Sequence, residues 1–248
     1  MIDKKLELEH WESEHTMEYH CKQFLEPKRM TVAFEEFLSR NCNISSGYIL
    51  DLGCGGGAAD VYLSKLHPEL KILGIDIVEK AFELFDHFAD ENTKRCVTLQ
   101  KGDWYNLDKS LIGKFDGVVS LQSLSWLEDW KSPLEKICDL KPNWLALSSL
   151  FYEGKINYQI RLTDYELKGK EVPYQETYYN IYSIPIVRNF LAEHGYKDFV
   201  FEPFEIDIDL PKPQSLDAGT YTVKTEEGRR LQISAAMLMP WYFIFASK

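Results

Sequence analysis

Apolar positions along this chain follow two alternating patterns, short continuous runs and stripes with helical spacing. The run that begins at Tyr48 stops at a cluster of glycines, and beyond it Ala59, Tyr62, Leu63 and Leu66 recur at intervals of three or four. Such a stripe is typical of one helix face, whereas a short apolar run bounded by glycines is typical of a buried strand. The sequence therefore predicts a strand, a glycine loop and a helix in succession.

The same alternation extends on both sides of this unit. A helix is predicted from Met30, where apolar residues again keep helical spacing. Further apolar runs predict strands at 70–77, 95–101, 115–121 and 143–150, with helices from residue 81 and from the capping box Ser132–Glu135. Repeated strand–helix pairs imply right-handed crossovers and a parallel sheet, with ligands beyond the carboxyl ends of the strands.

The pattern changes after residue 150. Residues 151–182 contain seven tyrosines and no long apolar periodicity, which suits a segment inserted on the substrate side. Ser183-Ile-Pro185 opens a helix that Gly195 closes. Alternation then predicts a long strand over 197–210, a hairpin between 220–225 and 229–233, and a last strand over 241–246.

Four glycines lie within the five positions from Gly53 to Gly57. Glycine tolerates positive φ and close approach, so such a loop can surround a small ligand at the start of a helix. A purely structural turn needs one or two glycines, which favours a cofactor site. The spacing Gly53-x-Gly55-x-x-Ala58 also fits the dinucleotide fingerprint, so a nicotinamide dinucleotide stays an alternative. Asp51 argues against it, because a carboxylate would repel a pyrophosphate and attract a cationic ligand.

The run Leu50-Asp-Leu-Gly-Cys-Gly-x-Gly57 resembles motif I of the class I S-adenosylmethionine-dependent methyltransferases, and the resemblance covers about residues 47–150. Asp76 stands roughly 20 positions beyond Gly57, where α/β nucleotide sites hold an acid for both ribose hydroxyls. The resemblance implies that Asp103 accepts from the adenine amino group and that Trp104 covers the ring. The expected residues of an S-adenosylmethionine site are Asp51, Gly53, Gly55, Gly57, Asp76, Ile77, Asp103, Trp104, Gln122 and Arg29.

Two of these assignments have plain alternatives. The alternative for Asp103 is a loop or helix-cap position, because aspartate commonly accepts backbone N–H bonds there. Arg29 is assigned to the methionyl carboxylate, and its alternative is a solvated position at a helix end.

The resemblance also implies a fold and a domain plan. We expect an α/β, doubly wound, mostly parallel Rossmann-like seven-stranded sheet with an antiparallel last strand. Residues 1–248 would form a single methyltransferase domain with a helical lid (1–40), a cofactor-binding core (47–150), a substrate-side insertion (151–182) and an inserted hairpin (211–239). The carboxyl-terminal third loosely resembles small methyltransferases that act on surface-polysaccharide sugars.

Methyl transfer is an in-line displacement on a sulfonium, which depends on positioning and, for a hydroxyl acceptor, on a general base. The candidate catalytic bases are Glu153 and Tyr152, which follow the fifth strand, and His20 from the lid. Each is otherwise an ordinary surface or packing residue, and an amine acceptor would need no base. The segment Leu121–Trp126 contains no acid, so no metal ion is expected.

Charge and composition narrow the partners. The 28 Lys and Arg against 39 Asp and Glu give a formal charge of −11, which disfavours a nucleic-acid substrate. The five cysteines are scattered, which indicates reduced thiols and no disulfide framework. The amino terminus is too charged for a signal peptide. No apolar run approaches the ~18 residues of a membrane helix. We therefore expect a cytoplasmic protein without a membrane partner.

The tyrosines of 151–182 suit a sugar face, because each offers an apolar ring and a hydrogen-bonding tip. Loop packing or a dimer contact is the alternative. The sequence thus favours S-adenosylmethionine-dependent methyl transfer to a hydroxyl of a small polar or sugar-like acceptor, such as a nucleotide sugar. An NAD-dependent oxidoreductase and a non-catalytic S-adenosylmethionine-binding partner subunit remain the other two classes.

Overall fold

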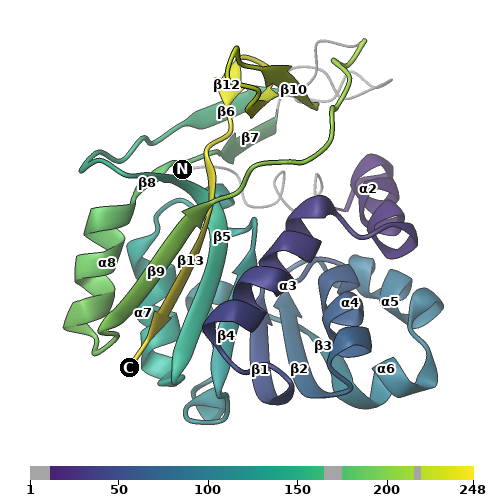
Figure 1. Ribbon diagram of the computed structural model, residues 1–248. Helices are drawn as coiled ribbons and strands as arrows, with labels where there is room; N and C mark the ends of the chain where they lie inside the picture. Colours follow the sequence, from purple (N-terminus) through teal and green to yellow (C-terminus); the bar gives the residue numbers. More distant parts are fainter. Residues whose placement is uncertain (1–11, 165–174, 215–218) are drawn as a thin grey trace.

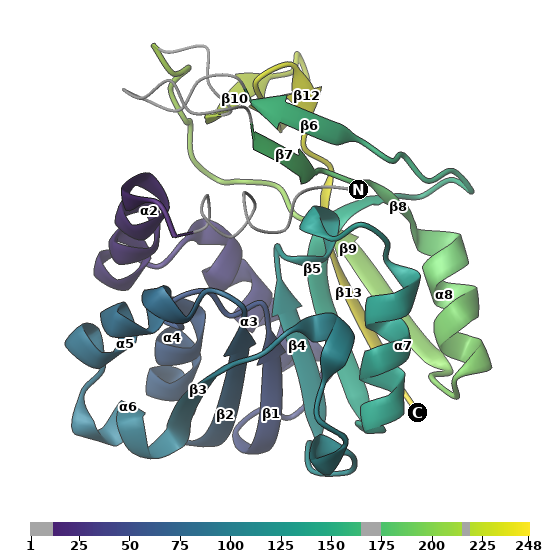
Figure 2. The ribbon, with the colours of Figure 1, turned by 180° about the vertical axis from the view of Figure 1, so that it is seen from behind.

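The structure is a computed structural model that describes residues 12–164, 175–214 and 219–248. A twisted central sheet carries helices on both faces (Figures 1 and 2). Its strands are β1 (Ser46–Leu52), β2 (Glu69–Asp76), β3 (Val97–Lys101), β4 (Gly117–Leu121), β5 (Trp144–Tyr152), β8 (Tyr182–Ser183), β9 (Asp198–Pro203) and β13 (Trp241–Ser247).

The sheet order is β3-β2-β1-β4-β5-β13-β9, and β8 pairs with the end of β5. Strands β1 to β5 run parallel to their neighbours, whereas β13 is antiparallel to both β5 and β9. The order confirms the expected doubly wound, mostly parallel sheet with an antiparallel last strand. The reversal of order between β1 and β4 is the kind of switch point at which such sheets bind ligands.

Helices cover the sheet in two layers, as Figures 1 and 2 show from opposite sides. The helices are α2 (Glu14–Leu25), α3 (Arg29–Asn41), α4 (Ala58–Leu66), α5 (Phe82–Phe88), α6 (Glu91–Cys96), α7 (Lys131–Leu140) and α8 (Ile184–Glu193). Single turns of 3₁₀ helix lie at Glu79–Ala81, Trp104–Asn106, Lys109–Leu111 and Leu124–Trp126.

Each face of the sheet has its own hydrophobic core. Ile49 of β1 packs with Phe34 of α3 and Leu63 of α4, whereas its neighbour Leu50 packs with Leu134 of α7 on the other face. Successive residues of a strand point to opposite faces, so a strand covered on both sides must be apolar at nearly every position. Burial on both faces therefore explains why Tyr48–Leu52 is apolar at every position except Asp51.

Several elements differ from the sequence prediction. Helix α7 does not use the capping box at Ser132, because the helix begins at Lys131 and Asp129 Oδ1 accepts from the Ser132 N–H at 2.7 Å. Strand β9 ends at Pro203 instead of continuing to residue 210. Helix α6, a short helix capped by Asp90, was not predicted.

Short accessory strands lie beyond the carboxyl ends of the parallel strands, at the same end of the molecule as α2 (Figures 1 and 2). They are the antiparallel pair β6 (Arg161–Asp164) and β7 (Gln175–Tyr178), and the three-stranded sheet of β10 (Thr220–Lys224), β11 (Arg230–Ser234) and β12 (Met237–Leu238). The pairing of β10 with β11 confirms the expected hairpin.

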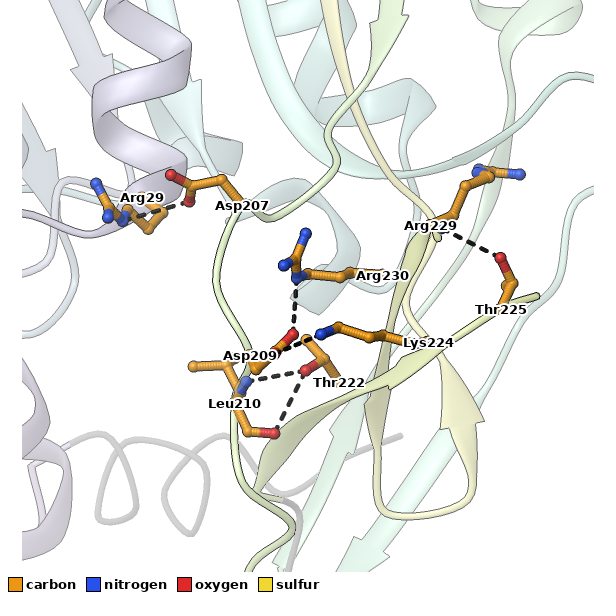
Figure 3. A network of polar contacts seen from close by, with 9 residues as sticks. All are labelled: Arg29, Asp207, Asp209, Leu210, Thr222, Lys224, Thr225, Arg229 and Arg230. Carbon is orange, nitrogen blue, oxygen red and sulfur yellow. Dashed lines mark hydrogen bonds and ion pairs between the residues drawn. The ribbon is translucent and has the colours of Figure 1, made fainter. Parts of the chain in front are cut away.

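The segment after β9 attaches this hairpin to the rest of the protein (Figure 3). Asp209 forms ion pairs with Lys224 at 2.7 Å and Arg230 at 2.8 Å, and the backbone N–H of Leu210 donates to the Thr222 hydroxyl at 2.9 Å. The stretch beyond Pro203 makes these polar contacts with the hairpin instead of extending β9. None of the helices in the described ranges combines the length and the hydropathy needed to cross a membrane.

Candidate cofactor site

The glycine loop between β1 and α4 adopts a backbone that only glycine takes without strain. Gly53, Gly55 and Gly57 have φ of 77°, 56° and 79°, in the left-handed region. The N–H of Gly53 donates to Ile75 of β2 at 2.8 Å, which ties the loop to the neighbouring strand. Gly57 is the residue before the first turn of α4. The loop thus presents backbone N–H groups at the start of a helix, where they can bind a small anionic or polar group of a ligand.

Asp76 at the end of β2 holds this loop in place. Its Oδ2 accepts from the N–H of Gly55 at 2.8 Å, and its Oδ1 accepts from the N–H of Val78 at 2.9 Å. Burial raises the pKa of Asp76, against the effect of these backbone bonds. Each carboxylate oxygen has a further lone pair, so ribose hydroxyls can still be bound. Ile77 beside it is 40% exposed and offers an apolar surface at the same place.

The structure separates the roles expected for Asp103 and Trp104. The Asp103 carboxylate caps the following turn, accepting from the Tyr105 N–H at 2.9 Å and from Asn106 Nδ2 at 3.0 Å. This is the cap alternative, and a contact with adenine stays a prediction. Trp104 is only 6% exposed and belongs to the hydrophobic core. Because core packing covers the indole, the expectation that it covers the adenine ring is not supported.

The lid helix α2 brings His20 onto the glycine loop. A Cβ placed on Gly55 would lie 2.7 Å from His20 Cε1, so the imidazole rests directly on this glycine. Burial, and then the charge of Lys28, lower the pKa of His20 to about 4. The ring is therefore neutral at pH 7, and its unprotonated nitrogen can act as a base.

Lys28 links the lid to the end of β4, and sequence reasoning missed it. Its Nζ donates to Gln122 Oε1 at 3.2 Å and also contacts the Tyr19 hydroxyl. Gln122 has φ of 56°, a left-handed conformation that is rare for a residue with a side chain. Residues held in such conformations are often found at functional sites. The structure thus brings Gln122, His20 and the loop into one cluster.

Arg29, one residue further on, faces elsewhere. Its Nε lies 3.3 Å from Asp207 Oδ1 on the segment after β9, and both side chains are exposed (Figure 3). Binding of a methionyl carboxylate by Arg29 stays a prediction, and in this structure the guanidinium is paired on the surface.

The other two candidate bases lie at the end of β5. Glu153 Oε1 accepts from the Tyr242 hydroxyl at 2.8 Å, and this contact is exposed. Tyr152 is 42% exposed and forms an edge-to-face pair with Tyr158 at 6.2 Å between ring centroids. Their contacts are thus with β13 and with the segment after β5, a different part of the site from the one that His20 occupies.

The tyrosines between 151 and 182 do not form one surface. Tyr152 and Tyr158 are exposed, but Tyr179 and Tyr182 are buried. The Tyr182 hydroxyl donates to the Leu127 carbonyl at 3.1 Å, a structural role. Tyr165 and Tyr174 lie outside the described residues.

Two buried acids lie beneath the loop. Asp51 of β1 and Asp60 of α4 are 1% and 0% exposed, and sequence reasoning missed Asp60. Burial raises the pKa of both carboxyl groups. Asp51 Oδ1 has no hydrogen-bond partner among the described groups, which fits a ligand with cationic groups above it better than it fits a pyrophosphate. In the described ranges, His, Cys, Asp and Glu side chains do not gather in the groups of three that would hold a metal ion.

Known proteins share both sequence and fold with this chain. The family profile described as a methyltransferase domain matches residues 49–142. The ubiquinone biosynthesis O-methyltransferase of Chromobacterium violaceum is 26% identical over 160 residues, which cover 62% of this chain and 64% of that protein. This chain therefore spans less than two thirds of that relative's length.

Two solved structures contain bound S-adenosylmethionine. Human N-acetylserotonin methyltransferase superposes with a TM-score of 0.55 at 16% identity, over 96% of this chain and 57% of that one. The glycopeptide N-methyltransferase MtfA superposes with a TM-score of 0.52 at 15% identity, over 90% of this chain and 95% of that one. At such identities they show a shared fold. The matching profile covers the strands that carry the glycine loop and Asp76, so this part of the chain is similar to a methyltransferase domain.

Proposed function

We propose that this protein transfers the methyl group of S-adenosylmethionine to a hydroxyl of a small polar, sugar-like acceptor, such as a nucleotide sugar. The observation that supports the proposal is the bond between the Asp76 carboxylate and the Gly55 N–H, which joins two of the residues expected to bind the cofactor. The acidic composition, with a formal charge of −11, supports a small molecule in preference to a nucleic acid as the partner.

Bound S-adenosylmethionine supplies an electrophilic methyl group, and the chain supplies its position and a proton acceptor. The glycine loop and Asp76 orient the cofactor, while the covering lid excludes water from it. His20 lies on the loop with its pKa lowered to about 4, so it is unprotonated at neutral pH and can accept the hydroxyl proton at a ring nitrogen. The positive charge of Lys28 opposes a protonated ring, which favours passing that proton on to solvent.

A hydroxyl is favoured over an amine because a base stands at the loop. The curated relative named above is an O-methyltransferase, which supports the same choice, whereas the glycopeptide enzyme is an N-methyltransferase. Tyr152 and Tyr158, exposed side by side beyond β5, give the acceptor side an aromatic surface of the type that stacks on sugar rings.

Turnover with an acceptor panel tests the proposal. Nucleotide sugars, free sugars, phenols and amines are incubated with S-adenosylmethionine, and S-adenosylhomocysteine is quantified. Calorimetry with S-adenosylmethionine and NAD accompanies the panel. Methylation of a hydroxyl compound is expected; turnover of amines alone refutes the oxygen acceptor, and binding of NAD alone refutes the methyl transfer.

Variants of the candidate bases test the mechanism. Removing a general base costs ~10²–10⁴-fold in rate. We expect His20→Ala to lower kcat by that order while S-adenosylmethionine still binds, and Glu153→Gln to do so if the acceptor lies nearer β5. His194→Ala is the matched control, because its ring bonds to the Phe190 carbonyl at the end of α8, away from the loop. If both base variants turn over like the parent protein, neither side chain is the base.

A further inference from the structure

The ammonium group of Lys28 is held by neutral partners. It donates to Gln122 Oε1 at 3.2 Å, contacts the Tyr19 hydroxyl and lies 4.2 Å from the centre of the Tyr19 ring. Among the side chains of residues 12–164, 175–214 and 219–248, no acid pairs with it. The neighbouring Arg29, in contrast, pairs with Asp207 on the surface. A cation surrounded by neutral groups is available to an anionic group of a ligand.

The position of Lys28 in the fold does not favour the helix that follows it. Lys28 is the residue before the first turn of α3, and its side chain makes no capping hydrogen bond there. Serine, threonine, aspartate and asparagine are the residues that stabilise a helix from this position. A positive charge is also unfavourable beside the positive end of the helix dipole. The stability of α3 therefore does not explain a lysine at this position.

The turn after β4 presents Gln122 to this ammonium group. The backbone of Gln122 is left-handed, with φ of 56°, and its N–H donates to the Ser148 carbonyl at 2.8 Å. The hydroxyl of Ser123, the next residue, donates to the Gly53 carbonyl at 3.1 Å. A residue with a side chain keeps a left-handed conformation only when its surroundings hold it. The contact between Lys28 and Gln122 therefore joins the lid to a turn that is fixed on the glycine loop and on β5.

The same ammonium group lies beside the proposed base. The rings of Tyr19 and His20 pack edge to face, with 5.5 Å between their centroids. Burial, and then the charge of Lys28, lower the pKa of His20. Burial, and then Tyr19, raise the pKa of the Tyr179 hydroxyl, and the Tyr179 ring packs on Trp126 at 4.5 Å between centroids. An acceptor whose hydroxyl reaches His20 would therefore have the Lys28 charge and these aromatic rings as neighbours.

The acidic composition makes a local cation necessary for an anionic acceptor. With a formal charge of −11, the protein as a whole repels anions. Lysine binds phosphate as a point charge and can offset this repulsion where the ligand sits.

We propose that Lys28 is a specificity-determining residue that binds an anionic group of the acceptor, a phosphate such as that of a nucleotide sugar, while the acceptor hydroxyl faces His20. This inference rests on the proposed function, because it concerns the acceptor of the same reaction. Gln122 and the Tyr19 hydroxyl keep the ammonium group in place until the phosphate arrives.

The test measures the binding of phosphate compounds to protein saturated with S-adenosylhomocysteine, so that the carboxylate of the cofactor is already bound. Inorganic pyrophosphate, UDP-glucose and the neutral methyl glucoside are titrated by calorimetry. The two anionic probes should bind the parent protein, and methyl glucoside should bind more weakly than UDP-glucose. Lys28→Gln should weaken both anionic probes at least about tenfold, because a hydrogen bond between charged groups is lost. Lys28→Arg keeps the charge and should lose less affinity than Lys28→Gln.

Lys80→Gln is the matched control. Lys80 Nζ donates to the Glu12 carbonyl at 3.1 Å, ahead of α2. This change therefore also removes one positive charge and one contact with the lid, but it lies after β2 instead of at the end of β4. The affinity of this variant for pyrophosphate should equal that of the parent protein.

A second comparison identifies the source of the anionic group. S-Adenosylhomocysteine and 5′-methylthioadenosine, which lacks the amino-acid part, are titrated into the parent protein and into Lys28→Gln. If Lys28→Gln weakens S-adenosylhomocysteine alone and binds both anionic probes like the parent, Lys28 binds the cofactor and the proposal is overturned. Absence of binding of both anionic probes to the parent, or equal losses in Lys28→Gln and Lys80→Gln, also overturns it. Failure of S-adenosylhomocysteine to bind the parent refutes the proposed function instead.

Discussion

Replacing Asp76 with alanine tests two roles of one carboxylate at once. In the protein this side chain accepts from the N–H of Gly55 at 2.8 Å and from the N–H of Val78 at 2.9 Å. Hydrogen bonds to a charged group contribute ~1.5–3 kcal/mol each. Part of this is offset because a half-buried carboxylate no longer has to be desolvated. We expect Asp76→Ala to lower the free energy of unfolding by about 2–4 kcal/mol.

The same change should weaken cofactor binding beyond its effect on the fold. Loss of even one bond between carboxylate and ribose corresponds to about a tenfold loss of affinity or more. A loop released from Asp76 would add to this. Urea unfolding and calorimetric titration with S-adenosylhomocysteine measure the two effects separately. Asp76→Asn, which keeps one acceptor oxygen and turns an NH₂ group toward a backbone N–H, should lie between parent and alanine variant.

The matched control is Asp108→Ala. Asp108 accepts from the Ser110 N–H at 2.7 Å in an exposed turn, so it loses a similar backbone bond away from the loop. Its affinity for S-adenosylhomocysteine should equal that of the parent. Parental affinity in Asp76→Ala would refute the ribose assignment, and parental stability would refute the role of Asp76 in holding the loop.

Three further outcomes follow from the same site. Gly57→Ala should destabilise the protein more than Gly113→Ala and should also weaken cofactor binding. Both glycines have positive φ, but only at Gly57 would an added Cβ meet another side chain, Leu99 at 2.9 Å. Equal losses of stability in urea unfolding would contradict this. The free energy of unfolding should fall as pH rises from about 4 through 7. Burial raises the pKa of Asp51 and Asp60, so the folded state binds more protons than the unfolded state in this range. Urea unfolding at pH 5 and pH 8 measures the difference, and constant or rising stability contradicts it. EDTA should leave turnover unchanged, and loss of activity restored by magnesium would show a metal role.

The cofactor side was predictable because its signals are local in the sequence. Tyr48–Leu52 is apolar except at Asp51, because both faces of β1 are buried, and Gly53, Gly55 and Gly57 need the positive φ that the structure shows. Asp76 was also predictable from the sequence, because its position at the end of β2 follows from the lengths of α4 and β2 after the glycine loop. Trp104 shows the limit of this reasoning, because whether an aromatic ring faces a ligand or a core depends on contacts with distant residues.

Contacts that the apolar pattern does not show decided the elements that were predicted wrongly. Ser132 has the pattern of a helix cap, but Asp129 bonds to its N–H and the helix starts earlier. The alternation after β9 resembles a strand, yet beyond Pro203 the backbone has the hairpin as its partner, with Leu210 bonded to Thr222. Asp60 was missed for the same reason, since nothing near it in the sequence indicates the facing acid.

The accessory strands, where we propose that the acceptor binds, are held by different contacts from those of the glycine loop. This difference explains why the sequence does not identify the acceptor. The hairpin β10–β12 is joined to the segment after β9 by ion pairs of Asp209 with Lys224 and Arg230, and that segment is joined to α3 by Asp207 with Arg29 (Figure 3). Exposed ion pairs of this kind contribute only ~0–1 kcal/mol each and weaken with salt. Such contacts let the accessory strands vary in sequence and move at little cost while the sheet beneath them stays fixed. Under the proposed function, side chains that no motif constrains select the acceptor, whereas the cofactor contacts a loop whose backbone geometry admits few sequences.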